Sequence, residues 1–216
     1  MYVIFAPAVI GAYLLGSIPF GLLIAKAHGK DLRSIGSGNI GATNVSRALD
    51  RKWAYVCFAL DVMKGLVPML VIMFIAKPAG IVKLMLWLVV GCAAILGHIF
   101  PIYLKFKGGK AVSTSFGVAL GLWPYYTICA LFAFAIWIVV VLIWRYVSLA
   151  SIAASVTFPL VLILAIVLKR GWNFVSLWPL LIPATAIPLM VIVRHRENIK
   201  RLLAGTEDKI LKGKSS

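Results

Sequence analysis

Long apolar runs separated by short polar segments form the main pattern of this chain of 216 residues. Several runs reach or approach the roughly 20 residues that an α-helix needs to cross a bilayer. A helix satisfies its own backbone hydrogen bonds in lipid, so each run predicts a helix. We therefore expect an all-α integral membrane protein with seven transmembrane helices, at about residues 2–25, 53–76, 81–104, 112–123, 125–144, 147–168 and 176–193.

The fourth predicted span, 112–123, is short for a full crossing, and the positive charges bear on whether it crosses. If all seven segments cross, one side of the membrane holds 17 of the 22 Lys and Arg residues, and Lys64 lies inside the second span. Because basic residues accumulate on the cytoplasmic side, we expect the N-terminus outside and the C-terminus in the cytoplasm. A fourth span that turned back would place the basic tail outside, which argues for a crossing.

The same pattern predicts a single domain, formed by the seven spans over residues 1–204, and a flexible basic cytoplasmic tail at 205–216. The run at 2–25 lacks a basic start and a small-residue cleavage site, so we interpret it as the first span and not as a removable signal. The cysteines lie within apolar runs, where cysteine is usually a small buried hydrophobe; they are Cys57, Cys92 and Cys129.

Charged residues make up 13% of the chain and are unbalanced, with 22 Lys and Arg against 6 Asp and Glu. Apart from Glu207-Asp208, no adjacent carboxylates could hold magnesium for phosphate chemistry, so we expect no metal and no cofactor. Asp61 and Lys64, three residues apart in the second span, are expected to neutralise each other. Topology and anionic lipid account for the positive excess, so the expected partner is the bilayer and not nucleic acid.

The first polar cluster is the glycine loop, defined here as residues 37–44, which lies between the first two spans. Its hydroxyls, amides and freely turning backbone N–H groups are suited to holding a phosphate. The alternative is a loop whose side chains only cap its own backbone. The candidate ligand-binding residues are Ser37, Gly38, Asn39, Gly41, Thr43 and Asn44, with Arg47 following.

The second polar cluster is the Gly-Gly-Lys turn, formed by Gly108, Gly109 and Lys110. Two glycines permit a tight turn, and the helix predicted immediately afterwards would offer free N–H groups and a positive dipole end to an anion. The spacing differs from that of a Walker A loop. A glycine turn in an ordinary basic cytoplasmic loop explains the same residues equally well.

Two further clusters lie on the same predicted side of the membrane. Ser148 follows Arg145 at the start of the sixth span, where it could bind a ligand or simply cap a helix. After the seventh span, His195 and Asn198 would share a face if the helix continues, with Arg196 between them. A histidine, an amide and guanidinium groups could hold a phosphate or orient a hydroxyl, and a basic interfacial helix is the alternative.

Taken together, the clusters resemble those of the bacterial membrane glycerol-3-phosphate acyltransferases that use acyl phosphate as donor. The matching segments are 36–44 with Arg47, 107–110, 145–151 and 195–198, in the same order along nearly the whole chain. The resemblance implies transfer of a fatty acyl group from acyl phosphate to the 1-hydroxyl of sn-glycerol 3-phosphate. The products would be 1-acylglycerol 3-phosphate (lysophosphatidic acid) and phosphate, in the first acylation of phospholipid synthesis at the bacterial cytoplasmic membrane.

For this reaction we expect positioning and charge stabilisation, without a covalent enzyme intermediate. The glycine loop and Lys110 would hold the acyl phosphate, while Arg47, Ser148, His195 and Asn198 would hold glycerol 3-phosphate. We assign catalytic roles to Ser37, Lys110, His195 and Asn198 and substrate binding to the other candidates. The hydroxyl proton would go either to His195 or to the phosphate of the substrate.

Two other classes of function fit the sequence less well. A transporter for an organic phosphate would need polar groups near the membrane middle, where only Asp61 and Lys64 are candidates. A structural lipid-binding scaffold would not need four polar clusters on one side. The sequence leaves the oligomeric state open, a monomer included.

Overall fold

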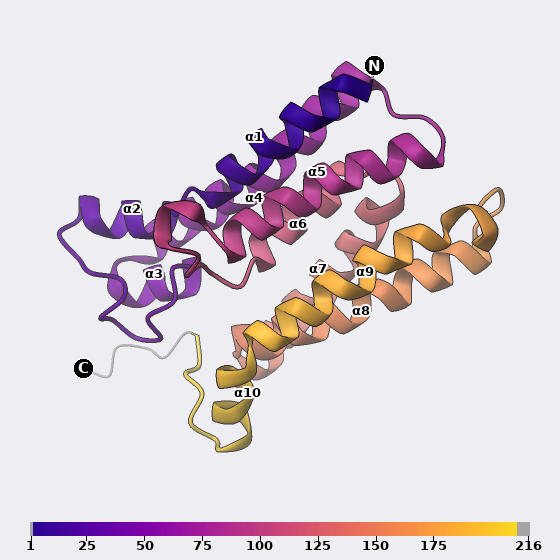
Figure 1. Ribbon diagram of the computed structural model, residues 1–216. Coiled ribbons are helices and arrows are strands. Elements are labelled where there is room, and N and C mark those ends of the chain that lie inside the picture. The colour runs from indigo at the N-terminus through magenta and orange to yellow at the C-terminus, as the bar shows by residue number, and fades with distance from the viewer. Residues whose placement is uncertain (1, 211–216) are drawn as a thin grey trace. The chain divides into compact units, whose positions relative to one another are not determined.

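Helices are the only regular secondary structure in residues 2–210, which are the residues that the computed structural model describes (Figure 1). Residues 211–216 of the predicted tail lie outside this range. The prediction of an all-α membrane protein is confirmed. The α-helices are α1 (Phe5–Ser17), α2 (Phe20–Ala27), α3 (Ala42–Ala48), α4 (Arg51–Ala76), α5 (Ile81–Ile99), α6 (Val112–Gly121), α7 (Tyr125–Trp144), α8 (Val147–Leu168), α9 (Phe174–Arg194) and α10 (Arg196–Leu203).

Six segments of the described chain are long and apolar enough to cross a membrane, one fewer than the sequence predicts. The exception is α6, which replaces the predicted span 112–123 and has only 10 residues. At 1.5 Å per residue, such a helix is about 15 Å long, roughly half the hydrocarbon thickness of a bilayer. The other predicted spans all correspond to segments that meet the criterion.

The first span is interrupted at Ile18 and Pro19, between α1 and α2. Proline has no N–H to donate to the preceding turn, so the helix cannot continue regularly. The ammonium group of Lys64, from α4, donates to the carbonyl of Ile18 at 3.0 Å. Lys64 also lies 2.8 Å from the Asp61 carboxylate, and both side chains are buried. This confirms the predicted pair and gives it a role in stabilising the helix break.

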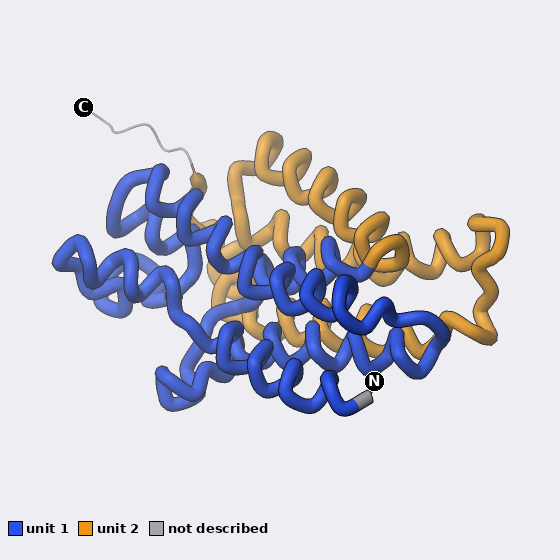
Figure 2. Tube along the Cα trace, turned by 90° about the horizontal axis from the view of Figure 1, so that it is seen from above, with its two compact units in different colours: residues 1–122 blue, residues 123–216 orange. Residues whose placement is uncertain are grey.

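The chain forms two compact units, residues 1–122 and residues 123–216 (Figure 2). In unit 1, α1 packs against α5, and α4 packs against α6. Glycine allows backbones to touch at both contacts: a Cβ on Gly97 would collide with the carbonyl of Tyr13, and one on Gly117 with that of Val62. Small residues allow such close helix packing in membranes, where hydrophobicity does not drive association.

Figure 1 shows α2, α3 and the loop before α6 at the end of unit 1 that lies away from the N-terminus. This end carries both polar clusters of the unit. In unit 2, α8 packs against α7 and α9, and α10 contacts α8 and α9. Many large apolar side chains of unit 2 are exposed, including Leu142, Val167 and Leu168. Lipid-facing helices expose such side chains at no cost, because lipid tails are as apolar as leucine.

Candidate active site

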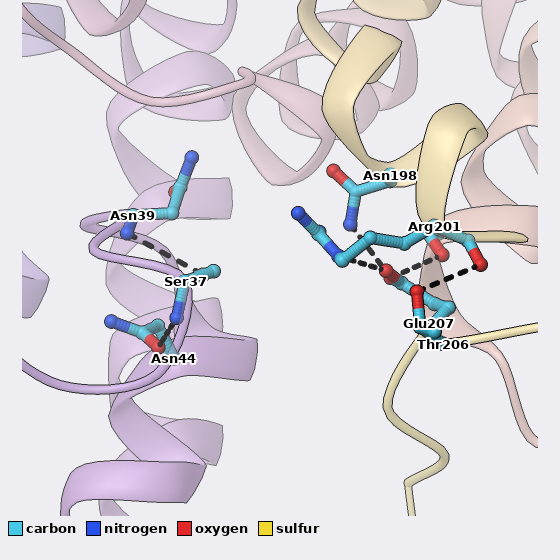
Figure 3. Close-up of polar contacts among 8 residues, drawn as sticks. Ser37, Asn39, Asn44, Asn198, Arg201, Thr206 and Glu207 are labelled. Carbon is cyan, nitrogen blue, oxygen red and sulfur yellow. Dashed lines mark hydrogen bonds and ion pairs between the residues drawn. The ribbon is translucent and has the colours of Figure 1, made fainter. Parts of the chain in front are cut away.

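The glycine loop is held in shape by its own side chains. Asn44 is 1% exposed, and its amide nitrogen donates to the carbonyls of Leu32 at 2.9 Å and Ile35 at 3.0 Å. Its amide oxygen accepts from the backbone N–H of Ser37 at 3.0 Å. Asn39 accepts from the N–H of Gly41 at 3.0 Å, two residues ahead. The self-capping alternative therefore accounts for Asn39 and Asn44, whose contacts fold the loop (Figure 3).

Two glycines allow the chain to turn here. Gly36 and Gly38 have φ angles of +55° and +65°, a region that favours glycine. Ser37 lies between them and is exposed, with its oxygen accepting a long bond of 3.4 Å from the N–H of Asn39. Ser37 is thus the member of the loop best placed to offer its hydroxyl to a ligand. Arg47 is half-buried in α3, with its side chain beside Gly36.

The Gly-Gly-Lys turn packs against the end of α5. The N–H groups of Gly108 and Gly109 donate to the carbonyls of Ile99 at 3.2 Å and His98 at 3.1 Å. Each position requires glycine because a Cβ would collide with His98, either its carbonyl or its ring. The glycines therefore bring the turn close to α5, and their N–H groups satisfy carbonyls at the helix end.

Lys110 lies just before α6, and not in its first turn, because α6 begins at Val112 after Ala111 in a left-handed conformation with φ +60°. The turn is linked to the glycine loop by Arg33, whose guanidinium donates to the carbonyl of Lys107 at 2.6 Å. Unit 1 thus brings its two predicted clusters to one end of the helix bundle. Lys110 is half-buried there.

His98 connects the Gly-Gly-Lys turn with the buried ion pair. It is 5% exposed, and its Nδ1 lies 3.7 Å from the carboxylate of Asp61. His98 is thus a buried histidine at the end of α5. Asp61, Lys64 and His98 join α4, α5 and the break in the first span into one buried polar group.

The third and fourth predicted clusters lie in unit 2. Ser148 is 5% exposed in the first turn of α8, whose N-cap is Tyr146 and not the serine. The helix after the seventh predicted span does not continue unbroken, because α9 ends at Arg194 and α10 begins at Arg196. His195, at this junction, and Asn198, in α10, are nevertheless both buried. Arg196 is exposed, 3.5 Å from Glu197.

The ring of His195 is oriented by a hydrogen bond between its Nδ1 and the carbonyl of Val191, at 2.7 Å. A carbonyl can only accept, so in the neutral ring Nδ1 carries the hydrogen and Nε2 carries the lone pair. The Nε2 atom is therefore the one that could take a proton from a substrate. This orientation suits a general base.

Glu207 is not among the site residues predicted from the sequence, because it lies in the segment predicted as a flexible tail. Its carboxylate is buried and accepts hydrogen bonds from Asn198 and Arg201, each at 2.7 Å (Figure 3). It also accepts one from the Ser148 hydroxyl at 2.7 Å. We call these four residues the Glu207 cluster. Burial alone would raise the pKa of Glu207, but the three hydrogen bonds and the positive charge of Arg201 outweigh it and lower the pKa. A pair of adjacent carboxylates in the tail was the one available signal.

The predicted residues therefore fall into two groups. Unit 1 holds the glycine loop, Arg47 and the Gly-Gly-Lys turn, with Thr43 half-buried in the first turn of α3. Unit 2 holds Ser148, His195, Arg196 and Asn198. Beside them, a hollow of about 390 Å³ is lined by Tyr146 and residues 205–209 of the tail.

A family model described as glycerol-3-phosphate acyltransferase matches residues 6–205. Among named relatives, the glycerol-3-phosphate acyltransferase of Aquifex aeolicus is 46% identical, and the match covers 92% of this chain and 95% of that one. The enzyme of the same name from Geotalea daltonii is 44% identical, with 93% and 94% covered.

Two solved structures of PlsY, an integral membrane glycerol 3-phosphate acyltransferase, have similar folds. The glycerol 3-phosphate form gives a TM-score of 0.82 and the lysophosphatidic acid form 0.79. Each is 42% identical to this chain, and each match covers 95% of both chains.

Proposed function

Since the chain belongs to the glycerol-3-phosphate acyltransferase family, we propose that it transfers a fatty acyl group from acyl phosphate to the 1-hydroxyl of sn-glycerol 3-phosphate. The protein is a multi-pass membrane acyltransferase. The observation that carries the substrate assignment is the likeness, over 95% of the chain, to structures of PlsY in glycerol 3-phosphate and lysophosphatidic acid forms. The acyl phosphate donor follows from the resemblance of the polar clusters.

We assign the donor phosphate to unit 1. The exposed hydroxyl of Ser37 can donate a hydrogen bond to a phosphate oxygen, and the ammonium of Lys110 can offset the charge that develops as phosphate leaves. In this proposal Gly38, Asn39, Gly41, Thr43 and Asn44 keep the loop in the shape that exposes Ser37. Gly108 and Gly109 likewise set the position of Lys110 through their contacts with α5.

We assign the acceptor to Ser148, His195, Arg196 and Asn198 of unit 2. Arg47, in unit 1, remains a predicted ligand of a substrate phosphate. The substrate hydroxyl oxygen attacks the acyl carbon, and the bond between this carbon and the phosphate oxygen breaks. Inorganic phosphate leaves with the bonding electrons. The hydroxyl proton passes to Nε2 of His195 in this proposal, because the bond from Nδ1 to Val191 leaves Nε2 as the proton acceptor.

The proposed topology has seven crossings, with the N-terminus outside and the active site on the cytoplasmic side of the bacterial cytoplasmic membrane. The short helix α6 then accounts for one crossing by meeting a thinned or recessed surface. The 17 basic residues predicted on one side support this arrangement. A cysteine at an exposed site in each loop, labelled from outside in intact cells, tests it: only loops on the outer side should react.

Purified protein in detergent, given acyl phosphate and glycerol 3-phosphate, tests the reaction. We expect equal amounts of released phosphate and lysophosphatidic acid, the latter identified by mass spectrometry. Omitting glycerol 3-phosphate should stop both, and acyl-CoA should not replace the donor. Phosphate release without acylated product would contradict the proposal. The transporter alternative is weakened because its candidate groups, Asp61 and Lys64, bond to each other; uptake of glycerol 3-phosphate into sealed vesicles would revive it.

A further inference from the structure

The described part of the tail folds back along unit 2. Gly205, with a φ angle of +69°, turns the chain after α10, and the N–H of Thr206 donates to the carbonyl of Arg201 at 2.8 Å. Farther on, the N–H of Ile210 donates to the carbonyl of Arg145 at 2.8 Å, just before α8. These bonds place Glu207 between α10 and the start of α8.

The carboxylate of Glu207 uses its two oxygens differently. Oε1 accepts from both the Ser148 hydroxyl and the Asn198 amide, and Oε2 accepts from Nε of Arg201. Hydrogen bonds to an ionised acceptor are about twice as strong as neutral ones. The carboxylate therefore fixes two side chains to which we assign substrate binding, and it balances the charge of Arg201.

This arrangement decides what Ser148 can do for a substrate. A serine hydroxyl has one hydrogen and two lone pairs. Because the hydrogen is directed to Glu207, Ser148 presents its lone pairs to any other partner. It can then accept a hydrogen bond from an alcohol but cannot donate one to a phosphate oxygen.

We propose that Glu207 is a positioning residue of the acceptor site, which turns Ser148 into a hydrogen-bond acceptor for a glycerol hydroxyl and holds Asn198 beside it. The proposal rests on the proposed function, because it concerns how the alcohol substrate is bound. Glu207 acts through Ser148 and Asn198 and needs no contact with the reacting atoms.

The substitution Glu207→Gln tests this directly. The glutamine oxygen could still accept from Ser148 and Asn198, but only as a neutral acceptor, and the amide nitrogen would face Nε of Arg201, which is also a donor. We expect the KM for glycerol 3-phosphate to rise about tenfold or more, from the loss of hydrogen bonds to a charged group. The KM for acyl phosphate should change little, whereas the melting temperature at pH 7 should fall because the charged carboxylate also contributes stability. A purely structural role would instead lower the active fraction, and hence kcat, with both KM values unchanged.

Glu197→Gln is the matched control, because Glu197 is an exposed carboxylate of α10 whose ion pairs, with Arg196 and Lys200, are themselves exposed. It should behave as the wild type. Glu207→Gln should raise the KM less in the Ser148→Ala background than in the wild type, since Glu207 acts partly through Ser148. If Glu207→Gln does not fold, Glu207→Asp keeps the charge but withdraws the carboxylate by one methylene, and the same KM should rise.

The outcomes separate the two proposals. A wild-type protein that does not acylate glycerol 3-phosphate contradicts the proposed function. An active wild type with an unchanged KM in both Glu207 variants overturns the positioning role alone. A lower KM in Glu207→Gln would also overturn it, since the carboxylate would then compete with the substrate for Ser148 and Asn198.

Discussion

The glycine loop of unit 1 and the Glu207 cluster of unit 2 both gather serine and asparagine side chains, but their hydrogen bonds end on different acceptors. Asn44 and Asn39 bond to the backbone of their own loop. Ser148 and Asn198 instead bond to a carboxylate 59 and 9 residues away. Figure 3 shows both arrangements. In the glycine loop, the asparagine side chains fix the backbone conformation. In the Glu207 cluster, the polar side chains donate hydrogen bonds to a negatively charged carboxylate.

The difference teaches that residue type alone does not identify the atom that meets a ligand. In the glycine loop, the buried asparagine is committed to the fold, and the exposed serine is available. In the Glu207 cluster, the serine is buried and its hydrogen is committed to a carboxylate. Substituting the buried asparagine of the glycine loop should therefore mainly lower stability. Substituting the buried serine or its partners in unit 2 should mainly lower activity.

The largest effect is expected at His195, the proposed proton acceptor, which lies three residues before Asn198 of the Glu207 cluster. His195→Ala should lower kcat by about 100- to 10,000-fold, the usual contribution of a general base, while glycerol 3-phosphate still binds. Turnover and calorimetric binding measure the two quantities. His28→Ala is the control, because His28 makes the same bond to a carbonyl four residues earlier, at 2.8 Å, but is exposed. Near-normal turnover in His195→Ala would assign the proton to the phosphate of the substrate.

Asn44→Ala should cause the largest loss of stability in the glycine loop. It leaves the N–H of Ser37 and the carbonyls of Leu32 and Ile35 without their partner, at a cost of about 3 kcal/mol in the free energy of unfolding. Thermal unfolding in detergent measures it. Ser37→Ala should leave the melting temperature unchanged and reduce the rate with acyl phosphate. If Asn44→Ala proved as stable as the wild type, Asn44 would not be the residue that stabilises the loop conformation.

Gly109→Ala should destabilise the Gly-Gly-Lys turn by about 1–3 kcal/mol, because the added methyl group meets the ring of His98. The displaced turn should also lower activity through Lys110. Gly11→Ala is the matched control, since a Cβ there meets nothing within 4 Å and alanine favours a helix. Unfolding curves and initial rates of both variants test this, and equal stability of the two would argue against close packing.

The smallest effect is expected from the titration of Glu207. Its pKa is lowered in the folded protein, so the charged form contributes stability above its ordinary pKa of 4.5, and this contribution is lost as the pH falls through and below that value. The melting temperature of the wild type should therefore fall more between pH 7 and pH 4 than that of Glu207→Gln. Parallel curves for the two proteins would show that this carboxylate contributes nothing to the pH dependence.

The helices follow from the sequence because apolar runs of sufficient length must pair their backbone groups internally in lipid. The Asp61–Lys64 pair follows as well, since residues three apart share a helix face. The length of α6 does not, because Leu122 and Trp123 are apolar whether or not the helix includes them. The bond between Ser148 and Glu207 was out of reach for another reason: no local pattern joins residues 59 apart. For the same reason, the packing of Gly108 and Gly109 on His98 could not be inferred from a glycine pair.

The position of Glu207 after the last described membrane helix has a consequence for biosynthesis. Chains fold from the N-terminus as they are made. The bond from Arg33 to Lys107 lies within the first 122 residues, so unit 1 can complete it before unit 2 is translated. Ser148 and Asn198 receive their carboxylate only after the described membrane helices have been translated. A chain released just before Glu207 would carry these helices and yet lack the anion that orders its acceptor residues.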